Sequence, residues 1–182
     1  IHTEDKIFPF ATIEDFDLEL IKRVRIIASN RITVSHPWED LSDFELLKSS
    51  GLYKVDKTTN KEGFTLAAIL LFGKDETIVN ALPHHKTDLI LRKINLDRYD
   101  DREIVSTNLI DSYYKMMEFV KKHLNDPFYL EGDMRISLRD KIFREAVANS
   151  LIHREYSSAY VAKMIIEKDK VVFENANIPH AY

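Results

Sequence analysis

The sequence contains no cysteine, and this absence excludes several kinds of chemistry. A chain without cysteine forms no disulfide, has no thiolate nucleophile and binds no zinc ion through sulfur. The absence is compatible with a reducing compartment, and we expect the protein to be cytoplasmic.

Long apolar runs are also absent. No stretch approaches the roughly 20 residues that a membrane-spanning helix needs, and no signal peptide is visible, so we expect no membrane partner. There is no internal repeat and no low-complexity tract. The chain starts at Ile1 and not at methionine, which leads us to expect an internal fragment of a longer protein.

Acidic residues are in only slight excess over basic residues. The 26 basic and 30 acidic residues give a net charge of -4, so the chain as a whole has no electrostatic drive toward nucleic acid, and any basic patch is local. The phosphate-binding motif G-x-x-x-x-G-K-[ST] does not occur, which excludes a helicase motor of that type from this chain.

The hydrophobic pattern of the 182 residues predicts an α+β fold with one substantial core or two small ones. We predict a helical middle module with short strands over residues 1–125, followed over 126–182 by a helix on an antiparallel sheet. Helices are predicted over 12–29, with a cap at Thr12 and Asp15, and over 42–50, with a capping box from Ser42 to Glu45. A helix is preferred over 65–72, where a buried strand is the alternative, and further helices are predicted over 75–82, 106–124 and 138–153. Strands are predicted over 52–55, 89–96, 160–167 and 171–174, with a solvated loop over 97–103.

The first half of the chain contains a winged-helix-like pattern. Two short helices are followed by a strand and by the polar turn 57–63, which could be a wing that contacts DNA. The same pattern is common in domains that never meet nucleic acid. Lys22, Arg23 and Arg25 could contact phosphate, although a solvated helix edge is the preferred interpretation. Trp38, the only tryptophan, is expected to anchor an irregular segment by packing.

The segment from Arg135 to Ser157 carries the most informative pattern. Ser137 can cap a helix whose apolar residues form two stripes, one through Val147 and Leu151 and a second through Leu138, Ile142, Ala146 and Ile152. We therefore expect this helix to be covered on two sides. Three polar residues spaced four apart fall within the second stripe: Glu145, Asn149 and His153. We call them the polar row.

Burying the polar row would be costly unless its members bonded one another, nearby backbone or a ligand. A carboxylate and a carboxamide one helical turn apart can hold a hard cation, and the cation can hold phosphates. That chemistry is typical of a nucleotide site. The alternative is a half-buried helix whose polar residues lie at its rim and meet water.

The motif REAVANSLIHREYS, followed by AKMIIEKDKVVFENANIPH, resembles the start of the GHKL-type ATPase domain found in certain bacterial proteins. Those proteins are described as transcriptional regulators or RecG-like ATP-dependent DNA helicases. The family pattern reads approximately R-E-x-x-x-N-x-x-x-H-R-[DE]-Y-[ST], and the chain matches it at Arg144, Glu145, Asn149, His153, Arg154, Glu155, Tyr156 and Ser157. The upstream segments GFTLAAILLFG and LPHHKTDLILRKINLDRYDDR resemble the region that precedes the ATPase domain in those proteins.

The resemblance implies a function and roles for the polar row. Glu145 would orient the water that attacks ATP, Asn149 would coordinate magnesium bound to the nucleotide, and His153 would lie at the edge of the site. An AlbA-like DNA-binding domain would precede this fragment, so DNA would be contacted through the full-length protein. Ala181 stands where many relatives have glycine, and the glycine-rich lid expected further on is missing, so we expect no ATP hydrolysis by residues 1–182 alone.

Two other functions remain open from the sequence. The helices could pack a homo-oligomer or hold neighbouring domains, in which case the polar row would be a satisfied polar seam in an interaction module. A metal hydrolase is the third interpretation. His84 and His85 do not favour it, because adjacent side chains diverge and no carboxylate stands at a diagnostic spacing from them.

Overall fold

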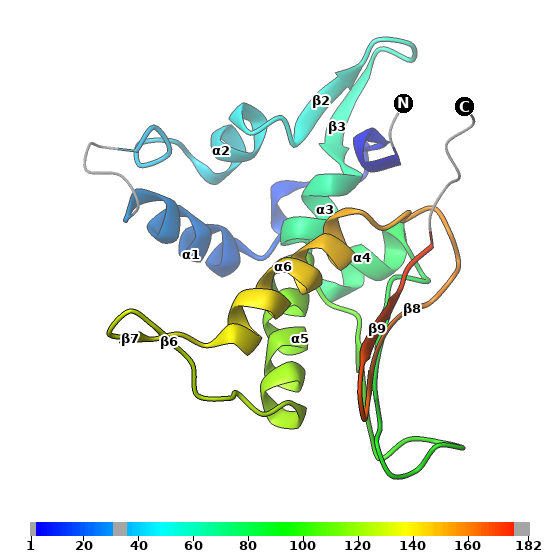
Figure 1. The fold of residues 1–182 in the computed structure, drawn as a ribbon. Coiled ribbons are helices and arrows are strands. Elements are labelled where there is room, and N and C mark those ends of the chain that lie inside the picture. Colours follow the sequence, from blue (N-terminus) through cyan, green and yellow to red (C-terminus); the bar gives the residue numbers. More distant parts are fainter. Residues whose placement is uncertain (1–2, 31–35, 177–182) are drawn as a thin grey trace, which may run out of the picture. The chain divides into compact units, whose positions relative to one another are not determined.

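Helices and short sheets alternate along the chain, so the fold class is α+β, as predicted. The computed structural model describes residues 3–30 and 36–176 (Figure 1). The chain divides into two units, Ile1–Pro83 and His84–Tyr182. We had placed the division at residue 125. The structure places it after Pro83, because a strand from the predicted first module joins the sheet of the second.

The first unit is built on a three-stranded antiparallel sheet. Its strands are β1 (Ile7–Phe8), β2 (Tyr53–Asp56) and β3 (Lys61–Thr65), in the order β1-β3-β2. The β2–β3 hairpin lies at the wing-like pattern of the sequence, but β3 begins at Lys61, within the predicted polar turn. Gly63 lets β1 approach β3 closely, because a Cβ at this position would lie 2.8 Å from Cγ2 of Ile7.

Helices of the first unit begin at polar caps. They are η1 (Thr3–Asp5), η2 (Ile13–Asp15), α1 (Leu18–Ser29), α2 (Asp43–Ser49), α3 (Leu66–Phe72) and α4 (Asp75–Ala81). The capping box at Ser42 is confirmed, since its hydroxyl accepts from the Glu45 amide at 3.2 Å. The predicted cap at Thr12 and Asp15 encloses only the turn η2. A separate cap, Asp17, starts α1 by accepting from the Leu20 amide at 3.0 Å.

Buried apolar side chains from every helix longer than one turn and from β3 form the core of the first unit. Phe16 and Phe64 pack at its centre, with their ring centroids 4.5 Å apart. The buried residues of this core include Phe16, Leu20, Ile21, Leu46, Leu47, Phe64, Leu66, Ile69, Leu70 and Ile78.

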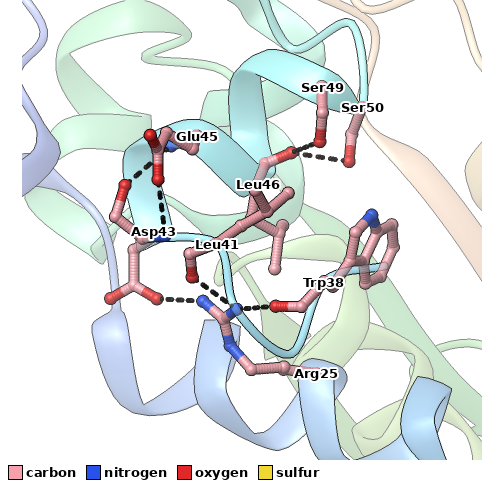
Figure 2. A network of polar contacts seen from close by, with 9 residues as sticks. Arg25, Trp38, Leu41, Asp43, Glu45, Leu46, Ser49 and Ser50 are labelled. Atoms are coloured by element: carbon pink, nitrogen blue, oxygen red, sulfur yellow. Dashed lines mark hydrogen bonds and ion pairs between the residues drawn. The ribbon is translucent and has the colours of Figure 1, made fainter. Parts of the chain in front are cut away.

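Arg25 organises the segment that leads into α2 (Figure 2). Its Nη1 donates to the carbonyl oxygens of Trp38 and Leu41, the latter at 2.8 Å, and its Nη2 donates to the Asp43 carboxylate at 2.7 Å. Arg25 is therefore a structural clamp and not part of a free basic edge. Trp38 is half-buried and its ring packs on His36, as expected for an anchor of irregular chain.

The second unit contains a four-stranded sheet in the order β5-β4-β8-β9. Its strands are β4 (Thr87–Arg92), β5 (Asp101–Val105), β8 (Ala162–Glu167) and β9 (Val171–Glu174). Strands β8 and β9 pair antiparallel, which confirms the prediction for 126–182. Strand β4 joins the same sheet parallel to β8, because the long connection through two helices returns the chain beside β4 in the same direction. The prediction of a loop over 97–103 was wrong for residues 101–103, because strand β5 begins at Asp101.

Two helices pack on this sheet, α5 (Leu109–His123) and α6 (Leu138–Ile152). A two-stranded hairpin, β6 (Leu130–Glu131) and β7 (Met134–Arg135), lies between them in sequence and turns at Gly132 with φ of 62°. The buried core joins both helices to the sheet through Leu89, Val105, Met116, Met117, Phe119, Val120, Val147, Leu151, Met164 and Ile166. Among the helices in the described ranges, none has the length and apolar character needed to cross a membrane.

Candidate functional site

Helix α6 carries the candidate site, and its ends follow from local sequence. Ser137 caps the helix as predicted, accepting from the Asp140 amide at 3.0 Å. The helix then contains no glycine or proline until it ends at Ile152, where His153 leaves the helical conformation. The amide of His153 still donates to the carbonyl oxygen of Asn149 at 3.0 Å, so the last turn stays closed.

Only one side of α6 is buried within the described part of the chain. Val147 and Leu151 are 0% and 3% exposed in the core, which confirms the first apolar stripe. The second stripe is covered only in part, since Leu138 and Ala146 are half-buried. Ile142 is 60% exposed and Ile152 is 64% exposed, so the prediction of a helix covered on two sides was wrong for these residues.

The polar row is exposed for the same reason. Glu145, Asn149 and His153 all lie on the uncovered side of α6. The cost of burial that we expected therefore does not arise here, because each of these groups can reach water. Periodicity placed the three residues correctly on one face, but it could not decide whether another part of the protein packs on that face.

Glu145 and Asn149 contact each other directly. The Asn149 amide nitrogen donates to Oε1 of Glu145 at 3.0 Å, as their spacing of four along a helix allows. We call these two residues the acid–amide pair. His153 is the C-cap of α6, one turn further along the same face, and is exposed. The structure thus places all three predicted site residues together, and it joins two of them by a hydrogen bond.

The acid–amide pair offers oxygen ligands that suit magnesium. The bond between the two side chains uses the amide nitrogen of Asn149 and one carboxylate oxygen of Glu145. The carbonyl oxygen of Asn149 is the atom that would hold a hard cation. Magnesium commonly takes only one or two protein ligands and completes its shell with water and substrate phosphates. The donor set is therefore chemically suitable for a magnesium–nucleotide complex.

Among the described residues, His84 and His85 belong to no group of three or more potential metal ligands. His85 bonds through Nε2 to the carbonyl oxygen of Thr107 at 2.9 Å, and its ring lies 5.9 Å from that of Tyr156. Within residues 3–30 and 36–176, no group of three or more His, Cys, Asp or Glu side chains is arranged to hold a metal ion.

Two further residues of the motif, Arg154 and Tyr156, are buried at 6% and 8% exposure. Sequence reasoning assigned them no role beyond matching the family pattern. The burial of an arginine directly after an exposed histidine could not be read from hydrophobic periodicity. The segment IPHAY, with Ala181 in place of the glycine of many relatives, lies outside the described residues.

Comparisons with known proteins describe the fold and leave the activity open. A family model described as a domain of unknown function (DUF8451) matches residues 2–88, which span the first unit and the start of β4. The crystal structure of the DIP2311 protein from Corynebacterium diphtheriae is similar to the whole chain, with a TM-score of 0.67 at 15% sequence identity. The match covers 100% of this chain and 34% of that one, so this chain spans about a third of its length. No curated protein matches.

Proposed function

We propose that α6 carries the nucleotide-binding face of a GHKL-type ATPase domain in a DNA-associated bacterial regulator. The observation that supports this most is the acid–amide pair, an exposed carboxylate and carboxamide bonded at 3.0 Å on a helix whose other side is anchored in a sheet core. The motif that contains the pair resembles that family at eight positions.

The proposed roles follow from the chemistry of each side chain. Asn149 would hold magnesium through its carbonyl oxygen, and His153 would lie beside the phosphates at the end of the helix. When bound, magnesium neutralises phosphate charge and orients the nucleotide. Glu145 would accept a proton from the attacking water as a general base, which requires an accessible carboxylate. Because the acid–amide pair is exposed, both residues can reach a ligand without a rearrangement of α6.

A Glu145→Gln substitution tests the catalytic role in the full-length protein. The change keeps the shape and a hydrogen-bonding group but removes the basic oxygen. We expect ATP and magnesium binding to persist while turnover falls about 100-fold or more, the usual scale of general-base catalysis. The melting temperature should stay level, because the only protein partner of Glu145 in the described ranges is the exposed Asn149 side chain. Full turnover in the variant would refute the catalytic role.

DNA association is part of the proposal through the β2–β3 hairpin. Lys54, Lys57 and Lys61 are exposed on this hairpin, but Lys54 already pairs with Asp5 at 2.5 Å. With a net charge of -4, contact would be local, weak and strongly salt-dependent. A duplex DNA titration at two salt concentrations distinguishes this from tight operator binding, which would show that a larger recognition surface exists.

One observation favours a second function, an interaction module. Ile142 and Ile152 flank the polar row and are 60% and 64% exposed, so this face of α6 also offers apolar contact area. In that case the acid–amide pair would be a polar seam within a homo-oligomer or a domain interface. An Ile142→Asp substitution that changes the oligomeric state but leaves nucleotide affinity intact would favour this function over the first.

A further inference from the structure

Arg154 lies where the chain leaves helix α6, and this segment is bonded to the one that leaves strand β9. It follows the C-cap of α6, and the next residue, Glu155, donates its amide to the carbonyl oxygen of Ala176 at 3.1 Å, just beyond β9. Asn175 joins the same two segments by donating to the carbonyl oxygen of Ser150 at 2.7 Å. Arg154 is therefore held at a junction that is fixed by one backbone hydrogen bond and one hydrogen bond from the Asn175 side chain.

The Arg154 side chain is 94% buried, since only 6% of its surface is exposed. Its guanidinium lies over the ring of Tyr156, 5.6 Å from the ring centroid. The hydroxyl of Tyr156 donates to the carbonyl oxygen of Leu151 at 2.6 Å, which fixes the ring against the end of α6. A contact of this kind between a cation and a ring uses no N–H···O hydrogen bond, so the N–H groups of the guanidinium still need acceptors.

Two of the Arg154 nitrogens are buried without an acceptor. Neither Nε nor Nη2 has a hydrogen-bond partner in the part of the chain that the structure describes. Burial also lowers the pKa of the Arg154 guanidinium, as expected when a charge is removed from water without a counter-ion. A buried cation in this condition is costly, so an acceptor for these two groups would stabilise the site.

The two nitrogens without an acceptor indicate which chemical class of ligand would bind them. Nε and Nη2 share one edge of a guanidinium, and their N–H bonds run parallel, which suits two oxygens of one anion. Arg102 uses the same edge elsewhere in this unit: its Nε and Nη2 donate to the two oxygens of Asp88 at 2.8 Å and 2.7 Å. Arg154 presents the same fork of two parallel N–H groups. These groups are buried, and no carboxylate among the described residues accepts from them.

We propose that the Nε–Nη2 edge of Arg154 is a binding site for a small oxyanion, a carboxylate or phosphate group that accepts two parallel hydrogen bonds. The stack on Tyr156 orients the fork, and the pinned junction keeps it in place. This site is built on a buried group and shares no residue with the exposed acid–amide pair. The proposal therefore does not depend on nucleotide binding at the polar row.

The first test follows the Arg154 Nε–Hε NMR signal in the intact protein. Inorganic phosphate and acetate are titrated separately, with chloride added to keep the ionic strength constant. We expect a saturable shift of this signal, while the signal of Arg144, an exposed arginine on α6, stays in place. A response to phosphate alone identifies a phosphate group, and a response to acetate identifies a carboxylate. No saturable shift with either anion would overturn the proposal.

The second test compares melting temperatures of the parent, Arg154→Met and Arg144→Met proteins with and without the responding anion. We expect the anion to raise the melting temperature of the parent and of Arg144→Met by several degrees, since a ligand that binds only the folded state stabilises it. Arg154→Met should show no such rise. Arg154→Lys should also show none, because lysine keeps the charge but lacks the fork. An equal rise in Arg154→Met would contradict the proposal.

Discussion

Arg25 donates to two carbonyl oxygens in the segment before α2 and to one carboxylate in α2. Removing its guanidinium would leave the carbonyl oxygens of Trp38 and Leu41 and the carboxylate of Asp43 without this donor. We expect Arg25→Met to lower the free energy of unfolding by about 1 to 3 kcal/mol, the cost of losing partners for half-buried polar groups. Urea denaturation measures the difference.

Lys22→Met is the matched control for Arg25→Met. It removes one positive charge from an exposed position on the same helix and should change stability by less than about 0.5 kcal/mol. Arg25→Lys should restore little, because an ammonium cannot reach three acceptors in the geometry of a guanidinium. If both methionine variants unfold at the same urea concentration as the parent, Arg25 is not a clamp.

Asp101 makes the stability of the second unit depend on pH. Its carboxylate accepts from Lys122 and pairs with His123, both at 2.7 Å, and these bonds hold the pKa of Asp101 below its ordinary value. A carboxylate with a lowered pKa in the folded state stabilises the fold above the pKa of the unfolded chain, about 3.9. That contribution is lost as the pH falls through the folded pKa.

An Asp101→Asn variant should therefore be less stable than the parent at pH 7, and the difference should shrink as the pH falls below about 4. Urea midpoints measured from pH 7 to pH 3 give this profile. Asp97→Asn, an exposed position in the same loop region, should track the parent throughout. A difference that grew toward low pH would contradict the role given to Asp101.

Two adjacent residues of helix α6 differ sharply in exposure, because they lie on different sides of the helix. Leu151 is 3% exposed in the core and Ile152 is 64% exposed. We expect Leu151→Ala to cost about 2 to 5 kcal/mol of unfolding free energy, and Ile152→Ala to cost less than about 0.5 kcal/mol. Urea denaturation of both variants checks the orientation of the helix. Similar losses from both would mean that Ile152 is covered in the protein.

Elements with strong local signals could be predicted from the sequence. The capping box at Ser42 and the Ser137 cap located the starts of α2 and α6. These features depend on contacts between residues close in sequence. The polar row was likewise placed on one face of its helix.

Features that depend on distant partners could not be predicted. The sequence of strand β5 is typical of a charged loop. In the structure, its charged side chains form ion pairs with residues distant in the sequence: Asp101 with Lys122, and Arg102 with Asp88. The parallel pairing of β4 with β8 needs the whole intervening connection, which no local pattern encodes. The exposure of the polar row and the burial of Arg154 depend in the same way on what packs nearby.

At the scale of the whole molecule, the proposed functions divide between the two units. The first unit carries the wing-like hairpin, and the second carries α6 with the acid–amide pair on its sheet. The similarity to the DIP2311 protein extends over both units, at an identity of 15% that establishes the fold and not the activity. The nucleotide site of the second unit is therefore the claim on which the account depends.

A calorimetric titration of ATP into the full-length protein tests that claim most directly. It compares the parent, Asn149→Ala and Ile152→Ala, each in magnesium and in excess chelator; Ile152→Ala controls for loss of an exposed side chain from the same helix. We predict magnesium-dependent binding by the parent and by Ile152→Ala, and no measurable binding by a folded Asn149→Ala protein. Equal ATP affinity in Asn149→Ala and the parent would contradict the account.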